Sequence, residues 1–232
     1  MTLRARSPRG GRGCEYGLVA TRPYDEADLL EIVAIGDPVL RRPAERVDPD
    51  VIVTTDFQRL IDRMRATMVA APGVGLAAPQ VGLGIRLAVI EDAPERWVDL
   101  DPATLAERER TELAFTVLVN PVVELVDEAG VMTFYEGCLS VPGYAGAVER
   151  ARSVRLSALG ADGEPFSALY TGWPARIVQH EVDHLDGRIY VDRAAIRSLS
   201  TVENLANRRG RPITELAEEF GFSLSPDQVG SS

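Results

Sequence analysis

The sequence contains no lysine, so its 25 basic residues are all arginines. This absence excludes chemistry that depends on lysine, such as Schiff-base formation or the lysine-containing phosphate loop of many nucleotide-binding proteins. Acidic residues number 35, and the net charge of −10 opposes binding to the phosphate backbone of nucleic acids and to anionic lipid surfaces. We therefore expect neither DNA nor a membrane among the partners.

Histidine and cysteine are also scarce. His180 and His184 are the two histidines of the chain, so any reaction or metal site that needs imidazole depends on this pair. The cysteines, Cys14 and Cys138, are too few and too far apart in the sequence to form a disulfide framework, which indicates a reducing compartment. We therefore expect the protein to be cytoplasmic.

Hydrophobic residues make up 45% of the 232 residues, which predicts one packed domain with tails. Residues 1–30 form an N-terminal tail with a basic start. Its beginning has no apolar region of a secretory signal, so a disordered tail and a transit peptide are the alternatives. Residues 31–195 form the expected main domain, and residues 196–232 a C-terminal extension with a short amphipathic helix and a polar, frayed end.

The longest uncharged run, residues 66–85, has the length of a membrane span. Its prolines and glycines would break the hydrogen bonding of a lone helix in lipid. We therefore expect the end of a helix, a tight loop and a strand in this run.

The remaining pattern mixes helical and strand periods. Residues 57–69 place apolar side chains at helical spacing and predict a surface helix. The sequence Ala161-Asp162-Gly163 predicts a hairpin turn after an alternating strand. Strands are predicted at 85–90, 115–119, 121–125, 152–159 and 166–170. Helices and largely antiparallel strands without a βαβ order define the fold class as α+β.

Residues 172–187 predict a helix with a proline in its first turn and a glycine at its end. The segment contains His180-Glu181-Val182-Asp183-His184, an H-E-x-x-H pattern. Histidines four residues apart on a helix can bind one metal ion, and the adjacent carboxylate can act as general base on a metal-bound water. The alternative is a pair of hydrogen-bonded histidines without a metal.

A catalytic site of this type needs a third protein ligand and an open position for water. A third histidine is excluded, because Tyr190 stands where one such pattern requires it. Glu203 is one candidate, as in sites with two histidines and a glutamate. Cys138 is another, since a thiolate binds divalent transition metals strongly, although a free cysteine is more often a small buried hydrophobe.

Three segments together resemble the peptide deformylase family: residues 73–80 (GVGLAAPQ), 136–140 (EGCLS) and 179–185 (QHEVDHL). Residues 36–41 (GDPVLR) are also similar to the N-terminal stretch of that family, and the resemblance covers roughly residues 31–195. It implies an α+β fold in which antiparallel sheets surround a central helix with the metal ligands. It also implies a hydrolase that removes the formyl group from nascent N-formylmethionyl chains, with residues 31–195 as its catalytic domain.

The resemblance also implies roles for individual residues. Glu181 would be the general base and acid, while the side-chain amide of Gln80 and the backbone N–H of Leu139 would stabilise negative charge on the formyl oxygen. Gln80 could equally orient the loop around Cys138. The metal ligands that the resemblance implies are Cys138, His180 and His184.

Residues 73–75 could accept an extended peptide as an added strand, since glycines let a backbone approach closely, although an ordinary turn is the alternative. The candidate substrate-binding residues are Val74, Gly75, Trp173 and Ile177, and the apolar ones among them are equally good core residues. Arg150 matches a family arginine and is predicted to pair with Glu136.

The sequence departs from the family pattern in two places. Residues 144–146 (YAG) stand where many members have an arginine, and Glu149 stands where proline is frequent. The departures leave open how the peptide beyond the methionine is held. A related amidohydrolase or peptidase with another formylated or acylated substrate, and a non-catalytic metal-binding relative, are therefore the alternative functions.

The family commonly uses one Fe²⁺ ion, and Zn²⁺, Ni²⁺ or Co²⁺ can replace it. The expected partners are N-formylmethionyl peptides of nascent chains and, through that role, the ribosome.

Overall fold

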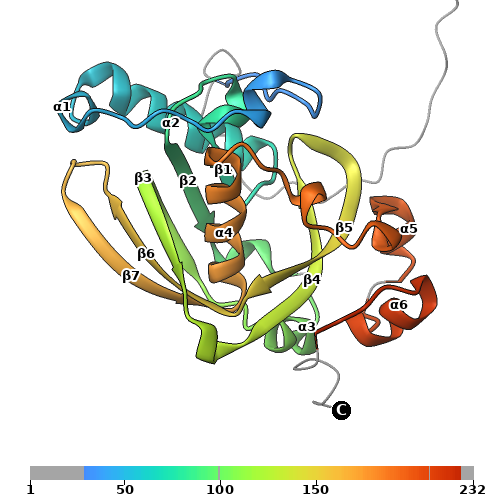
Figure 1. The fold of residues 1–232 in the computed structure, drawn as a ribbon. Helices are drawn as coiled ribbons and strands as arrows, with labels where there is room; N and C mark the ends of the chain where they lie inside the picture. The colour runs from blue at the N-terminus through green and yellow to red at the C-terminus, as the bar shows by residue number, and fades with distance from the viewer. Residues whose placement is uncertain (1–28, 99, 209, 226–232) are drawn as a thin grey trace, which may run out of the picture.

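The structure, a computed structural model, describes residues 29–98, 100–208 and 210–225. Two antiparallel sheets surround one central helix, α4 (Figure 1). The larger sheet has the strand order β1-β2-β3-β6-β7, and the smaller one has the order β4-β5-β8. The predicted α+β class is therefore confirmed. Cys14 and nearly all of the predicted basic tail lie outside the described residues.

The strands are β1 Gly75–Ala77, β2 Leu87–Asp92, β3 Leu113–Leu125, β4 Val131–Cys138, β5 Val141–Ala151, β6 Ser153–Leu159, β7 Pro165–Thr171 and β8 Ser200–Thr201. The helices are α1 Pro49–Ile52, α2 Thr55–Ala70, α3 Pro102–Glu107, α4 Trp173–Leu185, α5 Val202–Ala206 and α6 Ile213–Phe220. The long helices agree with the patterns at 57–69 and 172–187. None of the described helices is long and apolar enough to cross a membrane.

The core lies on both faces of strands β2 and β3. Ala88 and Ile90 of β2 pack in the cluster that contains α4, whereas Leu87 and Val89 pack in the cluster that contains α2. Because side chains alternate across a strand, this division means that α2 and α4 cover opposite faces of the sheet. The apolar run of β2 is therefore buried on both sides.

The prediction of two strands at 115–119 and 121–125 is wrong, because β3 is one bent strand. Its register with β6 shifts between Val119 and Val122, and Asn120 adopts a positive φ of 52°. The Asn120 side chain accepts from the Val47 N–H at 2.9 Å and donates to the Val47 carbonyl at 2.8 Å. An asparagine tolerates this backbone conformation, so the strand bends there without ending.

The β6–β7 hairpin forms where Asp162-Gly163 predicts a turn, with φ of +81° at Gly163. The longer β4–β5 hairpin was not predicted from the sequence. Residues 143–147 of β5 (GYAGA) are small except for Tyr144 and include no β-branched residue, so they lack the alternation that identifies a strand. This hairpin carries Cys138 at the end of β4, and it therefore places one of the candidate ligands.

Candidate metal centre

Cys138, His180 and His184 lie together at the middle of the molecule. Their three ligand atoms are all within 4.8 Å of one another, and Cys138 Sγ lies 3.3 Å from His184 Nε2. The histidines project from adjacent turns of α4, while the cysteine reaches them from the end of β4. Glu203 is exposed in the first turn of α5 and is not in this group, so the described residues favour Cys138 as the third ligand.

His180 is held in one orientation by two neighbours. Its Nδ1 lies 2.9 Å from Glu136 Oε2, and its ring stacks on Tyr190 with an interplanar angle of 18°. Burial alone would raise the pKa of Glu136, but the charge of Arg150 and hydrogen bonds from His180 and Arg150 outweigh it, so the pKa lies well below its usual range. Glu136 is therefore a carboxylate that accepts the Nδ1–H and directs Nε2 of His180 away from itself.

Two arginines hold the Glu136 carboxylate in place. Arg150 donates from Nε to Oε1 at 3.0 Å and from Nη2 to Oε2 at 2.9 Å, which confirms the predicted pair. Arg176 donates to Oε1 at 2.6 Å and to the Val148 carbonyl at 2.9 Å. Arg176 was not among the residues predicted from the sequence. An arginine four residues before His180, and so on the same side of α4 as the two histidines, was the available signal that a buried anion lies nearby.

Glu181 is buried beside the ligands, with a side chain that is 4% exposed. Its Oε2 and the Nδ1 of His184 are buried and have no hydrogen-bond partner in the structure. Burial raises the pKa of Glu181 to about 7. A Cβ atom on Gly75 would lie 2.2 Å from Glu181 Oε1, so β1 can approach this carboxyl group because it has a glycine there.

Gln80 lies in the short 3-10 helix η3 (Ala78–Val81), directly after β1. Its Oε1 accepts from the Ala77 N–H at 2.9 Å, and its Nε2 donates to Cys138 Sγ and to Ser140 Oγ, both at 3.4 Å. The side chain therefore bonds to the segment that carries Cys138, a contact that fits the predicted role of orienting this loop. Leu139, the residue proposed as a backbone donor, follows Cys138 directly.

A cavity of about 310 Å³ opens beside this group. The predicted substrate-binding residues Val74, Gly75, Trp173 and Ile177 all line it, together with Gln80, Cys138, Leu139, His180 and Glu181. Ile177 also belongs to the buried core, and Val74 and Trp173 pack against it. These side chains therefore serve the core and the cavity at once.

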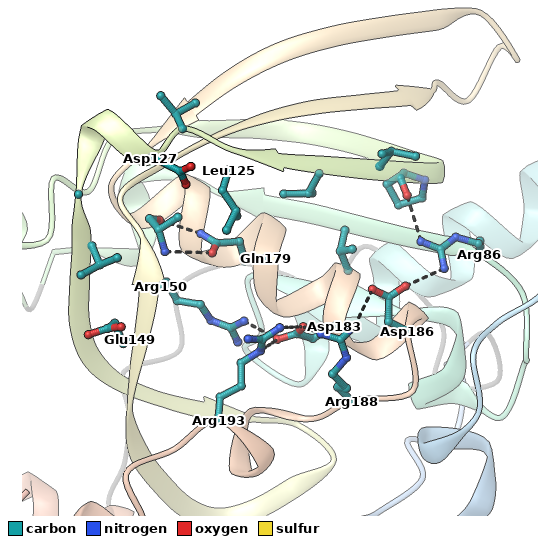
Figure 2. A pocket seen from close by; sticks show the side chains of 18 residues that line it. Arg86, Leu125, Asp127, Glu149, Arg150, Gln179, Asp183, Asp186, Arg188 and Arg193 are labelled. Carbon is teal, nitrogen blue, oxygen red and sulfur yellow. Dashed lines mark hydrogen bonds and ion pairs between the residues drawn. The ribbon is translucent and has the colours of Figure 1, made fainter. Parts of the chain in front are cut away.

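A second cavity, of about 530 Å³, lies against another face of α4 (Figure 2). Several of its polar side chains bond to one another. Asp183 accepts from Arg193 Nε at 2.7 Å and from Arg193 Nη2 at 2.8 Å, and it also accepts from Arg150. Asp186 accepts from Arg86 at 2.9 Å. We call this cavity the back cleft.

The donor set of the first cavity fits a divalent transition metal. One thiolate and two imidazoles are ligands that Fe²⁺, Zn²⁺, Ni²⁺ and Co²⁺ accept, and three protein ligands leave a coordination position open. Glu181 lines the cavity and its Oε2 is buried without a partner, so a water or a substrate there would complete the hydrogen bonding of the carboxyl group. The arrangement is suited to hydrolysis, because an acid/base group and a Lewis-acid site share one cavity.

The family model for polypeptide deformylases matches residues 29–199. Peptide deformylase 3 of Streptomyces avermitilis is 50% identical over 210 residues, which cover 85% of this chain and 86% of that protein. The chloroplastic/mitochondrial peptide deformylase 1A of Arabidopsis thaliana is 44% identical over 180 residues, which cover 78% of this chain and 66% of that protein.

Solved structures of peptide deformylases are similar to this chain as well. A class I type b peptide deformylase from Acinetobacter baumannii with Met-Ala-Ser bound is 36% identical with a TM-score of 0.63, and the match covers 71% of this chain and 98% of the other. A peptide deformylase from Synechococcus elongatus in complex with actinonin is 30% identical with a TM-score of 0.61, and the match covers 91% of this chain and 97% of the other. The similarity therefore extends over most of both chains.

Proposed function

The chain belongs to the peptide deformylase family, and we propose that Cys138, His180, His184 and Glu181 form its catalytic centre. The reaction is the hydrolysis of the formyl amide bond of N-formylmethionyl peptides, which releases formate and a peptide with a free amino terminus. The observation that carries the proposal is the cluster of three ligand atoms within 4.8 Å beside a buried carboxyl group that lacks a partner.

Cys138, His180 and His184 would hold one divalent ion, natively Fe²⁺, with Zn²⁺, Ni²⁺ or Co²⁺ as substitutes. When bound, the ion supplies Lewis acidity, which lowers the pKa of water and polarises a carbonyl oxygen. The protein's contribution is to keep the ligands in position. Glu136 orients His180, and Gln80 fixes the loop that carries Cys138.

Glu181 moves the protons of the reaction. Its Oε2 takes a proton from the water whose oxygen attacks the formyl carbon, and a pKa of about 7 lets the same group hold that proton. When the carbon–nitrogen bond breaks, Glu181 gives the proton to the departing amine. The products are formate and a free amino terminus, and the carboxyl group returns to its starting state.

Negative charge that develops on the formyl oxygen needs hydrogen-bond donors. The side-chain amide of Gln80 and the backbone N–H of Leu139 would supply them, since both residues line the cavity beside Cys138. The backbone at Gly75, on the open edge of β1, would pair with the extended peptide. The methionine side chain would lie among Val74, Trp173 and Ile177.

Residues 31–195 would form the catalytic domain, and the C-terminal extension begins at 196. Formylated nascent chains as substrate favour action in the cytoplasm and at the ribosome, where such chains emerge. An N-terminal transit peptide stays the alternative for the basic residues 1–13, which lie outside the described part of the chain.

The test is formate release from formyl-Met-Ala-Ser by protein purified without air and loaded with Fe²⁺. We expect rapid release by the unaltered protein and loss of release in Glu181→Ala at equal metal content. A fully metallated protein that releases no formate would contradict the proposal, and other formylated or acylated amides would then be the substrates to try.

A further inference from the structure

The mouth of the 310 Å³ cavity has no exposed charged side chain among the residues described there. The two carboxyl groups and the guanidinium that line the cavity are each at most 5% exposed, and the His180 side chain is 12% exposed. The exposed side chains of the lining belong instead to Pro72, Tyr144 and Val202. Tyr144 is 48% exposed and Val202 is 47% exposed.

Tyr144 and Val202 are 58 positions apart in the numbering, and strand pairing brings them together. Tyr144 of β5 is the partner of Thr201 in β8, and Val202 follows as the first residue of α5. The Thr201 hydroxyl accepts from the Asn204 N–H at 3.3 Å and so fixes the start of that helix. Figure 1 shows α5 beside the first part of β5. The C-terminal extension therefore builds one wall of the cavity.

The reacting atoms and the methionine pocket lie deeper in the same cavity. Glu181 and Ile177 are each 4% exposed, whereas Tyr144 and Val202 are about half exposed. When the formyl group lies beside Glu181 and the methionine side chain lies against Ile177, the rest of the peptide can leave the cavity only through its open side. The residues that follow the methionine must therefore cross the mouth.

From this arrangement, and resting on the proposed function, we propose that Tyr144 and Val202 form an apolar subsite for the two residues after the formylmethionine. The preferred substrates are formyl peptides with large apolar or aromatic side chains at those positions. An apolar side chain there removes the apolar surface of Tyr144 and Val202 from water, whereas a charged one finds no ion-pair partner in the lining. This chain thus uses apolar contact where the family pattern implies an arginine.

The first experiment compares four peptides with the full-length, metal-loaded protein: formyl-Met-Leu-Phe, formyl-Met-Ala-Ser, formyl-Met-Glu-Glu and formyl-Met-Lys-Lys. We expect kcat/KM for the Leu-Phe peptide to exceed that of both charged peptides about tenfold, chiefly through KM. Calorimetric dissociation constants of the four deformylated products should follow the same order, which separates binding from the chemical step.

Variants then assign the preference to the two residues. Tyr144→Ser and Val202→Ser should each reduce the ratio between the Leu-Phe and the Glu-Glu peptides to about threefold or less. Val202→Arg should raise kcat/KM for the Glu-Glu peptide relative to the Lys-Lys peptide, and a misfolded variant could not produce that gain. Leu169→Ser is the control, because Leu169 is an exposed apolar residue of β7 that does not line the cavity.

The outcomes separate the two proposals. Formate from all four peptides at equal kcat/KM would overturn the apolar subsite and leave the deformylase activity standing. Absence of formate from every peptide would instead contradict the proposed function. A preference for the Lys-Lys peptide that Glu203→Gln removes would show that this exposed neighbour of Val202 holds the chain by charge, and it would also overturn the apolar subsite.

Discussion

The buried polar groups on two faces of helix α4 differ in their hydrogen bonding. Among the residues that line the first cavity, Glu181 Oε2 and Trp173 Nε1 are buried without a hydrogen-bond partner. Towards the back cleft, Asp183 and Asp186 accept from arginines, and the Gln179 side chain bonds to both backbone groups of Ala151. An unsatisfied buried polar atom destabilises the folded protein by roughly 1–3 kcal/mol. Such an atom is therefore expected at a site where a bound ligand supplies the missing hydrogen bond. The proposed catalytic face is therefore the side of α4 on which buried polar atoms are left without partners.

The two faces are nevertheless joined through one arginine. Arg150 bonds to Asp183 on the side of the back cleft and to Glu136, which in turn holds His180. The complete bonding on one side therefore supports the orientation of a ligand on the other. Variants on each side should show how far the faces act independently.

The largest effect is expected on the catalytic face, in Glu181→Gln. This change keeps the shape of the side chain and removes the proton acceptor, so kcat should fall by about 10²–10⁴-fold. The check is the rate of formate release at equal metal content, with thermal unfolding as the control for folding. Retained activity would mean that Glu181 is not the base.

Gly75→Ala should displace Glu181 without altering its chemistry. The added Cβ would lie 2.2 Å from Glu181 Oε1, and a shift of about 1 Å in a catalytic group can reduce the rate about 100-fold. Gly84→Ala is the matched control, since an added Cβ there has no atom within 4 Å. Equal kcat values in the two variants would contradict the close approach of β1 to the carboxyl group.

Glu136→Gln should weaken metal binding more than it alters the chemical step. The amide oxygen is a weaker acceptor for His180 than the carboxylate. The substitution also removes the negative charge that Arg150 and Arg176 pair with at this position. We therefore expect metal affinity to fall about 10–100-fold. Zn²⁺ titration by calorimetry measures this loss. Unchanged affinity would show that His180 does not need this carboxylate for its orientation.

The smallest effect is expected from the arginines of the back cleft. Arg193 donates two hydrogen bonds to Asp183, at 2.7 and 2.8 Å, whereas the nearest nitrogen of Arg188 lies 3.7 Å from Asp183. Both side chains are partly exposed, which limits any gain. Arg193→Gln should therefore lower the free energy of unfolding by about 0.5–1 kcal/mol in urea, and Arg188→Gln should leave it nearly unchanged.

Equal effects of these two substitutions would show that hydrogen-bond geometry at Asp183 does not matter. A loss of Zn²⁺ affinity confined to Arg193→Gln would demonstrate coupling between the back cleft and His180.

The sequence predicts features that depend on local spacing. His180, Glu181 and His184 lie within one helix, and the Asp162-Gly163 turn and the amphipathic helices α2 and α6 are equally local. The sequence does not predict features that depend on pairing between distant segments. The β4–β5 hairpin, the burial of Arg176 against Glu136, and the meeting of Tyr144 with Val202 all require the folded sheet.

The candidate ligand Cys138 lies between these two cases. Its residue type and its neighbours in the sequence indicate a third metal ligand, but they do not exclude Glu203 from that role. The fold favours Cys138, because it places Sγ 3.3 Å from His184 Nε2.

The measurement that tests the catalytic face most directly is X-ray absorption spectroscopy of the zinc-loaded protein. We expect one sulfur ligand at about 2.3 Å and two nitrogen ligands at about 2.0–2.1 Å, together with one light atom that does not come from the protein. Cys138→Ser should abolish the sulfur contribution. A spectrum of the unaltered protein without sulfur, or with four protein ligands, would contradict the assignment of this face as an open, catalytic metal site.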